Sequence, residues 1–304
     1  MLRRQYLEST RKRSTFKCWT KQTVGNKMHI AWRGVTLTLS FLFLNFVSAG
    51  RTMKAFKTRH DNMHKRWWQA LKKNRPMDKI NLRQDDIQSS ISDFRTKCNP
   101  TDRYTSFDYC YNYFKTTSST DIEKNLERSC LTLGFYLASW GMLRGSSFLL
   151  EKSARYYARV IEYISSLPRE VWLIDVDNYS KNDEQIIDIY NKVKSTVIEN
   201  GNADLTLTTK ILLGVFGFIP AYDQYFANSF RKIFQGSCGF RKVNRKSLSC
   251  IELFYNENKD IIDNESNSIQ TIDFLTGKES GIKYPKAKII DMYGFNKGLM
   301  DSRN

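Results

Sequence analysis

A run of uncharged residues inside a helical hydrophobic repeat constrains the fold of this chain more than any other feature. Residues 129–143 carry no charged side chain. Apolar residues recur there and just before at three- and four-residue steps, at Ile122, Leu126, Cys130, Leu133, Leu137 and Trp140. This spacing predicts one helix over 120–143, with Thr120 and Glu123 in a capping box at its start. The uncharged run is shorter than the ~20 residues that a membrane span needs. We therefore expect a helix buried inside a globular protein.

Similar patterns predict that most of the chain after residue 53 is helical. Apolar residues at helical spacing indicate further helices over 60–73, 147–167, 183–199 and 247–260. The best candidate for a strand is 171–177 (VWLIDVD), and we expect at most this one short strand. Only 15 Gly and 5 Pro occur, which favours long regular elements. The sequence thus predicts a mainly α-helical globular domain over 53–304, built from helical hairpins.

Residues 1–52 differ from this domain in charge and pattern. The chain has a net charge of +17, and residues 1–80 hold 19 Lys and Arg against 3 acids, so the remainder is almost neutral. Residues 34–50 form an apolar run that is slightly short for a ~30 Å hydrocarbon core. Three interpretations stay open: a marginal membrane anchor or uncleaved signal, a cleaved signal, or an extension before a functional start near Met28 or Met53. A functional start near Met53 would make the protein cytoplasmic, and otherwise we expect membrane anchoring.

Histidine and cysteine usage excludes several kinds of chemistry from the domain. Residues 81–304 contain no histidine, which removes Ser-His-Asp systems, Cys-His systems and His-ligated metals. The six cysteines form no C-x-x-C pair, so we expect buried free thiols. Asp175-x-Asp177 resembles a metal-binding pair only weakly, and we expect a role at a turn. No third ligand accompanies Asp175 and Asp177, so we expect no metal site. No Walker or Rossmann glycine pattern occurs, so we expect no nucleotide cofactor, and nothing in the sequence indicates any other cofactor.

Residues 205–234 contain the most informative local pattern. An apolar helix carrying Lys210 ends near Gly217, a short connection with Pro220 follows, and a second helix starts at Asp223. This segment resembles part of the helix-hairpin-helix DNA glycosylase superfamily at Lys210, Gly217, Pro220, Asp223 and Phe226. The resemblance implies that Asp223 holds or stabilises the cationic sugar formed when a base leaves, and Lys210 is the second candidate catalytic residue. The residues alone also allow Asp223 to compensate a helix dipole.

Two further features could bind anions. Six basic residues occur between Asp223 and Glu252 with no acid among them: Arg231, Lys232, Arg241, Lys242, Arg245 and Lys246. A basic loop over 231–246 with Gly236 and Gly239 suits phosphate contact, or it is a solvated loop. Arg144, in the junction WGMLRGSS, could meet an anion or cap the carbonyls of the preceding helix.

These observations lead to three functional expectations. We expect a helical protein of unspecified role that contacts DNA or RNA through the loop 231–246. The first alternative is a glycosylase-like base-excision enzyme that uses Asp223. The second is an interaction protein anchored to a membrane by residues 34–50. The sequence does not choose among them, nor does it predict an oligomeric state.

Overall fold

The structure, a computed structural model, describes residues 84–198 and 205–303, and these residues are mainly α-helical, as the sequence predicts. Eleven α-helices lie in this part of the chain. They are α2 (Gln84–Arg95), α3 (Ser106–Thr116), α4 (Ser119–Lys124), α5 (Leu126–Ser139), α6 (Ala158–Ser166), α7 (Tyr179–Val197), α8 (Leu205–Phe216), α9 (Gln224–Ile233), α10 (Arg245–Glu257), α11 (Lys259–Ser268) and α12 (Lys286–Asp301). The predicted leader 1–52, including the apolar run 34–50, and the predicted helix over 60–73 lie outside the described residues.

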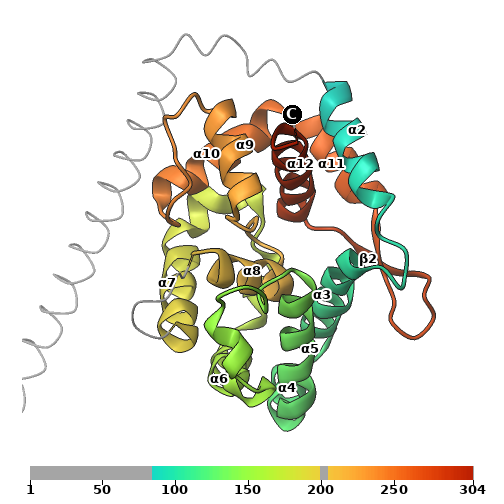
Figure 1. The fold of residues 1–304 in the computed structure, drawn as a ribbon, viewed down its shortest axis with the longest axis vertical. Coiled ribbons are helices and arrows are strands. Elements are labelled where there is room, and N and C mark those ends of the chain that lie inside the picture. The colour runs from blue at the N-terminus through green and yellow to red at the C-terminus, as the bar shows by residue number, and fades with distance from the viewer. Residues whose placement is uncertain (1–83, 199–204, 304) are drawn as a thin grey trace, which may run out of the picture. The chain divides into compact units, whose positions relative to one another are not determined.

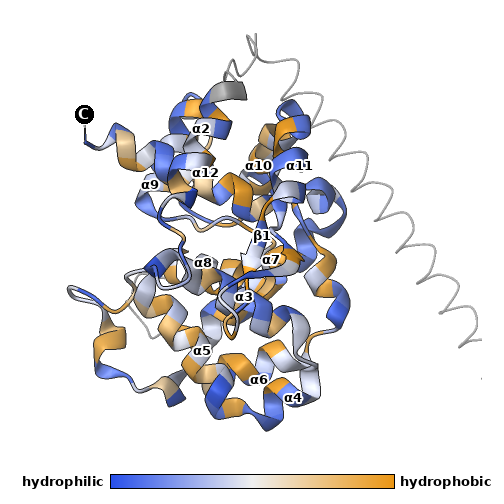
Figure 2. Cartoon of the chain, turned by 90° about the vertical axis from the view of Figure 1, so that its right-hand side faces the viewer, coloured by the Kyte–Doolittle hydropathy of each residue, from blue (hydrophilic) through white to orange (hydrophobic). Residues whose placement is uncertain are grey.

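The helices form two groups (Figure 1). The first helical group contains α3, α4, α5, α6 and α8, and the second contains α2, α9, α10, α11 and α12. Helix α7 packs against α6 and α8 of the first group and against α10 of the second. Figure 2 shows the same division from the side, with α4, α5 and α6 at the bottom and α2, α10 and α11 at the top. The long helix α7 therefore joins the two groups.

Helix α8 occupies the centre of the first group. All ten residues from Leu207 to Phe216 are buried, and α8 packs against α3, α5 and α7. Its sequence, LTLTTKILLGVF, contains one charged residue, Lys210. A helix that is apolar on every side must be removed from water, and here the surrounding helices do so. The same helix positions Lys210 at the boundary between the two groups.

A short hairpin supplies the strands of the described residues. Strands β1 (Gln270–Ile272) and β2 (Glu279–Lys283) pair antiparallel, with Gln270 opposite Lys283 and Ile272 opposite Glu279. The buried carboxylate of Asp108, on α3, accepts two hydrogen bonds, one from the Ile272 N–H at 2.8 Å and one from the Tyr284 hydroxyl. These bonds fix the hairpin against α3.

The predicted strand over 171–177 is wrong, because this segment forms two 3₁₀ turns, Arg169–Leu173 and Val176–Asn178. Asp175 lies between them, and its carboxylate accepts the backbone N–H groups of Val176, Lys286 and Ala287 at 2.8–2.9 Å. It therefore caps the start of α12, a distant element that the local sequence does not reveal. Asp177 forms an ion pair with Lys286 at 2.6 Å.

The single helix predicted over 120–143 is also wrong in detail, because the chain breaks into α4 and α5 at Asn125 (φ −103°, ψ 43°). The amide of Asn125 donates to the Asp121 carbonyl at 2.9 Å, which satisfies a carbonyl at the end of α4. Ser118, rather than Thr120, is the N-cap, and its hydroxyl accepts the Asp121 N–H at 3.1 Å. The apolar periodicity continues across the break, which explains why the pattern predicts one helix.

Candidate functional site

A pocket of about 380 Å³ lies where the two helical groups meet. The residues of the first group come from a 3₁₀ turn before α3, the end of α5 and its following loop, and α8. Those of the second group come from the start of α9 and from the last turns of α12 and the residues after it. The lining residues are Arg103, Tyr104, Trp140, Met142, Arg144, Thr206, Lys210, Asp223, Gln224, Tyr225, Phe295, Leu299 and Arg303.

Lys210 and Asp223 form an ion pair in this pocket, with 3.3 Å between the Lys210 ammonium nitrogen and one Asp223 carboxylate oxygen. Their side chains are 3% and 13% exposed, respectively. The Lys210 nitrogen also lies 4.7 Å from the ring centre of Trp140, a cation–π distance. The two residues predicted as a catalytic pair are therefore adjacent in the structure.

Asp223 is the N-cap residue of α9. One carboxylate oxygen accepts the backbone N–H groups of Tyr225 and Phe226, each at 3.0 Å, and the other faces Lys210. An N-cap carboxylate satisfies free N–H groups and interacts favourably with the helix dipole. The Asp223 carboxylate therefore does two things: it stabilises the start of α9, and it lines the pocket.

The corner between α8 and α9 depends on a glycine and on buried hydrogen bonds. Gly217 has φ +73°, and a Cβ there would come within 2.7 Å of Pro285 and of Tyr111. The hydroxyl of Thr209 then accepts the Tyr222 N–H at 2.9 Å, which brings the connection back onto α8. The Tyr136 hydroxyl donates to the Lys210 carbonyl at 3.0 Å, and burial raises the pKa of Tyr136 well above its ordinary value. Tyr136 therefore stays a donor at neutral pH and holds α8 against α5.

Aromatic rings form the walls of the pocket. Tyr104 and Trp140 lie 5.0 Å apart between ring centres, Tyr225 and Phe295 lie 5.3 Å apart, and Phe295 lies 6.0 Å from Trp140. The rings come from the 3₁₀ turn Arg103–Thr105, the end of α5, α9 and α12. The indole N–H of Trp140 is buried and has no hydrogen-bond partner within the described part of the chain. Tyr104, Tyr225 and Phe295 are half-buried, so these three rings can contact a planar ring bound here, whereas Trp140 is 5% exposed.

A second buried ion pair lies beyond Trp140. Lys288 and Asp291, one turn apart on α12, are 2.8 Å apart and are 1% and 3% exposed. The Lys288 nitrogen is 4.4 Å from the ring centre of Trp140. The second oxygen of Asp291 accepts the Ala221 N–H at 3.0 Å, in the corner that leads to Asp223. This pair therefore supports both Trp140 and the α8–α9 corner.

Three arginines give the pocket a positive character. Arg103, Arg144 and Arg303 are exposed, and none forms an ion pair with any residue that the structure describes. The guanidinium of Arg103 lies 4.9 Å from the ring centre of Tyr104. Asp223, already paired with Lys210, is the one acid among the lining residues. A ligand with negative charge would therefore meet uncompensated arginines.

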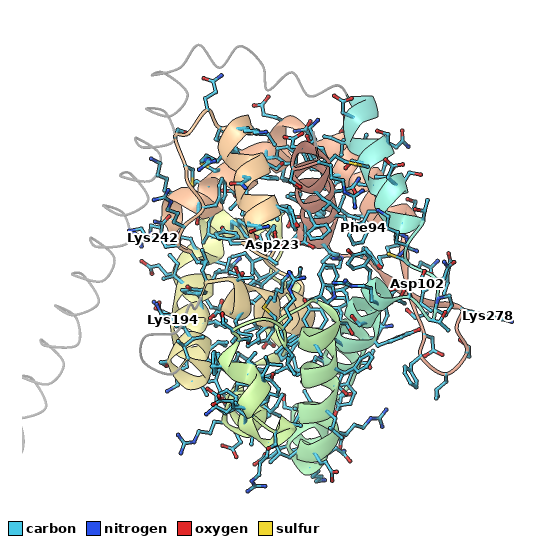
Figure 3. All side chains as sticks on the ribbon, in the orientation of Figure 1. Phe94, Asp102, Lys194, Asp223, Lys242 and Lys278 are labelled. Carbon is cyan, nitrogen blue, oxygen red and sulfur yellow. The ribbon has the colours of Figure 1, made fainter. Side chains whose placement is uncertain are left out.

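The predicted basic loop over 231–246 is wrong in its bounds, because Arg231 and Lys232 lie in the last turn of α9 and Arg245 and Lys246 begin α10, so that only 234–244 is a loop. None of the six basic residues of the segment 231–246 lines the pocket. Lys232 pairs with Asp301 at 2.8 Å, and Arg245 pairs with Asp183 and Glu184. Arg231, Arg241, Lys242 and Lys246 are exposed. Figure 3 shows Lys242 at the edge of the domain and Asp223 near its centre. The structure therefore brings Arg144, Lys210 and Asp223 together but leaves the loop apart from them.

Sequence reasoning missed most of the pocket. Phe295 and Leu299 lie four residues apart in the last turns of α12, and Arg303, four residues further along, follows the helix. The sequence contains this spacing. Arg103 and Tyr104 have no such signal, because their place in the pocket depends on how the chain packs after α2. Trp140 fits the apolar repeat of 122–140, so the sequence predicts that it is a core residue and does not indicate that it lines a pocket.

The described residues show neither a metal-binding cluster nor a helix that could cross a membrane. Within residues 84–198 and 205–303, no group of three or more His, Cys, Asp or Glu side chains is placed to hold a metal ion. None of the helices in these ranges combines the length and the apolar character that crossing a membrane requires.

Comparisons with known proteins give no match: no family model, no curated protein and no solved structure is similar to this chain.

Proposed function

We propose that this protein binds nucleic acid and that the pocket between the two helical groups receives one unstacked nucleotide. One observation carries this proposal: exposed arginines without carboxylate partners among the described residues, Arg103, Arg144 and Arg303, surround a pocket with aromatic walls. Guanidinium groups bind phosphate oxygens in a bidentate way, and aromatic rings stack on unstacked bases. These two interactions together suit a nucleotide better than they suit an uncharged ligand.

The size and polarity of the pocket support the same class of ligand. Its volume of about 380 Å³ falls in the range of ~300–1,000 Å³ for small-molecule sites. The Lys210–Asp223 pair offers a donor and an acceptor for the polar edge of a base. The exposed Arg231, Arg241, Lys242 and Lys246 would then bind phosphates outside the pocket, as a secondary surface.

The first experiment compares two matched double variants by fluorescence anisotropy with labelled single-stranded DNA and RNA. Arg144→Gln with Arg303→Gln removes two pocket charges, and Arg155→Gln with Arg159→Gln removes two exposed charges outside the pocket. A hydrogen bond to a charged group contributes about 1.5–3 kcal/mol, so we expect the pocket variant to bind roughly ten-fold more weakly or worse. The slope of log K against log salt should fall by about 0.7 for each phosphate group that the variant no longer binds.

The second double variant distinguishes binding inside the pocket from non-specific electrostatic binding to exposed basic residues. Residues 1–80 carry much of the positive charge, and they contribute equally in both variants. We expect Arg155→Gln with Arg159→Gln to change affinity only slightly. Equal losses of affinity and of salt slope in the two variants would contradict a nucleotide site in the pocket.

A second candidate function is base excision with Asp223, and the Lys210–Asp223 ion pair inside the pocket favours it. A carboxylate beside an extruded nucleotide could stabilise positive charge on the sugar as the base leaves. We place this function second because both oxygens of Asp223 already accept hydrogen bonds within the protein.

The enzymatic candidate predicts base release from duplexes that contain uracil, alkylated bases or oxidised bases. Asp223→Asn should abolish that release while its amide oxygen still accepts the Tyr225 and Phe226 N–H groups. Because the change also leaves the buried Lys210 without its carboxylate partner, urea unfolding and DNA affinity are measured on the same variant to separate loss of catalysis from loss of stability. Asp260→Asn, the same change at an exposed first turn of α11, is the matched control and should release base normally. If the unmutated protein binds DNA but releases no base from any of these substrates, the enzymatic candidate is excluded.

A further inference from the structure

A groove of about 850 Å³, more than twice the volume of the pocket, is lined by α3, α5 and the hairpin loop 273–278. The hairpin lies beside α3 at the edge of the domain (Figure 1). Seven large hydrophobic side chains are exposed in the part of the chain that the structure describes, and four of them line this groove. They are Leu131 and Phe135 on α5, and Phe274 and Leu275 in the hairpin loop. Large apolar side chains gathered in one groove mark an interaction surface.

Two phenylalanine rings in the groove are open to a ligand. Phe135 is 69% exposed and Phe274 is 72% exposed. Phe274 packs edge-to-face on Tyr109 of α3, with 5.0 Å between the ring centres, so its position is fixed although most of the ring is exposed. Proteins hold unpaired bases of any sequence by stacking them on such rings. The rings of Phe135 and Phe274 therefore suit the bases of a single strand.

The groove also contains partners for a phosphate backbone. The guanidinium groups of Arg103 and Arg128 lie over tyrosine rings, and neither forms an ion pair with a described residue. Hydroxyl side chains at Thr116, Thr117 and Thr132 line the same surface. Arginine and threonine side chains are common partners of phosphate oxygens. A purely apolar partner, such as one face of a peptide helix, would desolvate both guanidinium groups without pairing them.

The two acids of the groove are engaged in turns. Asp102 accepts hydrogen bonds from the backbone N–H and the side-chain amide of Asn99, at 2.9 and 2.7 Å. Asp273 accepts the backbone N–H and the hydroxyl of Thr276, each at 2.9 Å. These donor groups partly offset the negative charge of both carboxylates, which lowers the repulsion that a phosphate meets there.

The groove and the pocket are continuous at Arg103, which lines both. Its guanidinium lies 4.9 Å from the ring centre of Tyr104, a residue of the pocket wall. A phosphate bound to Arg103 would therefore lie where the two cavities meet. Because a phosphate joins each nucleotide to the next, a strand with one nucleotide in the pocket can continue into the groove. This continuity favours a nucleic-acid strand over an unrelated peptide.

We propose that the groove binds the single strand that continues from the nucleotide in the pocket, with bases stacked on Phe135 and Phe274. This inference rests on the proposed function and extends it, because it names single-stranded rather than duplex nucleic acid as the ligand. Arg103 binds the phosphate between the pocket and the groove. The bases of a duplex stack on each other, so their faces cannot stack on these rings.

The experiment compares the full chain with Phe135→Ala combined with Phe274→Ala by fluorescence anisotropy. The probes are a labelled single strand of about 12 nucleotides and the matching duplex, since one single-strand-binding domain covers ~4–16 nucleotides. A stacked base contributes about five-fold or more to affinity, so we expect the double variant to bind the single strand about twenty-fold more weakly or worse. Duplex affinity should not change. The salt dependence should also stay the same, because neither substitution removes a charge.

Three further double variants are the controls. Leu150→Ala with Leu173→Ala removes two side chains that are 54% and 72% exposed and line neither cavity, and it should bind like the unmutated protein. Tyrosine at both Phe135 and Phe274 keeps the rings and should keep single-strand affinity. Leucine at both positions keeps the apolar character without the rings and should lose affinity as alanine does. Thermal unfolding by circular dichroism checks that each variant is folded.

The possible results separate this inference from the proposed function. If Phe135→Ala with Phe274→Ala keeps full single-strand affinity while Arg144→Gln with Arg303→Gln loses it, the groove proposal is wrong and the pocket proposal stands. Equal losses for single strand and duplex, or full affinity in the leucine variant, would contradict base stacking. If the unmutated protein sediments as a dimer and the alanine variant as a monomer, a second copy covers the groove and the proposal is also wrong. Absence of any nucleic-acid binding by the unmutated protein would overturn both proposals.

Discussion

Replacing Asp291 with alanine is expected to lower the free energy of unfolding by about 3–5 kcal/mol. The change leaves the Lys288 ammonium buried without its partner 2.8 Å away, in a site where Lys288 is 1% exposed. It also removes the acceptor of the Ala221 N–H, which is 3.0 Å from the Asp291 carboxylate. Equilibrium unfolding in urea, followed by circular dichroism, measures the loss.

A double variant separates the unpaired charge from the lost side-chain volume. Lys288→Met removes the positive charge with little change in shape, and Asp291→Asn keeps an oxygen for the Ala221 N–H. Because well-packed neutral replacements of buried ion pairs are often neutral or stabilising, we expect this double variant to recover most of the stability. A loss below about 1 kcal/mol in Asp291→Ala would show that the pair is not important for stability.

The second large effect is expected from Gly298→Ala. In helix α12, Gly294 and Gly298 face α9, and a Cβ at Gly298 would lie 2.1 Å from the Tyr225 carbonyl oxygen. That oxygen belongs to backbone, so the two helices must move apart. Alanine is favoured over glycine in a helix by about 1 kcal/mol, and the clash must outweigh this gain. We expect a net loss of about 3 kcal/mol or more, at the upper end for an overpacked core.

Gly134→Ala in α5 is the matched control. A Cβ at Gly134 would lie 3.2 Å from the ring of Tyr157, a side chain that can shift. We expect a loss well below that of Gly298→Ala in the same urea experiment.

Gly298→Ala should also weaken nucleic-acid binding, because Tyr225 lines the pocket and follows the Asp223 cap. Equal stability of Gly298→Ala and the unmutated protein would contradict the close crossing of α9 and α12.

Local sequence patterns are sufficient to predict several elements of the fold. The apolar repeat through Leu133 and Leu137 predicts a buried helix, and both residues are fully buried in α5. The segment 205–234 predicts two helices with Asp223 at the start of the second, as α8 and α9 show. Each of these features depends on residues within a few turns of one another, so side-chain spacing and capping preference predict it.

Packing between distant segments determines the features of the fold that local sequence patterns do not predict. The carboxylate of Asp175 binds the start of α12, more than a hundred residues away, and this interaction replaces the predicted strand with 3₁₀ turns. Lys232 and Arg245 are equivalent to their basic neighbours in the sequence, yet acids from α12 and α7 neutralise them. A count of charges along the loop does not reveal these partners.

The sequence by itself determined that this protein is mainly helical, that its domain contains no histidine chemistry after residue 81, and that Asp223 begins a helix after a Lys-bearing one. The tertiary structure alone decided which charges stay free. It brings Arg103, Arg144 and Arg303 from three distant segments around one pocket and pairs Lys288 with Asp291 in the core. Helix formation follows from interactions between residues three or four positions apart, whereas a pocket exists only once separate helices have packed.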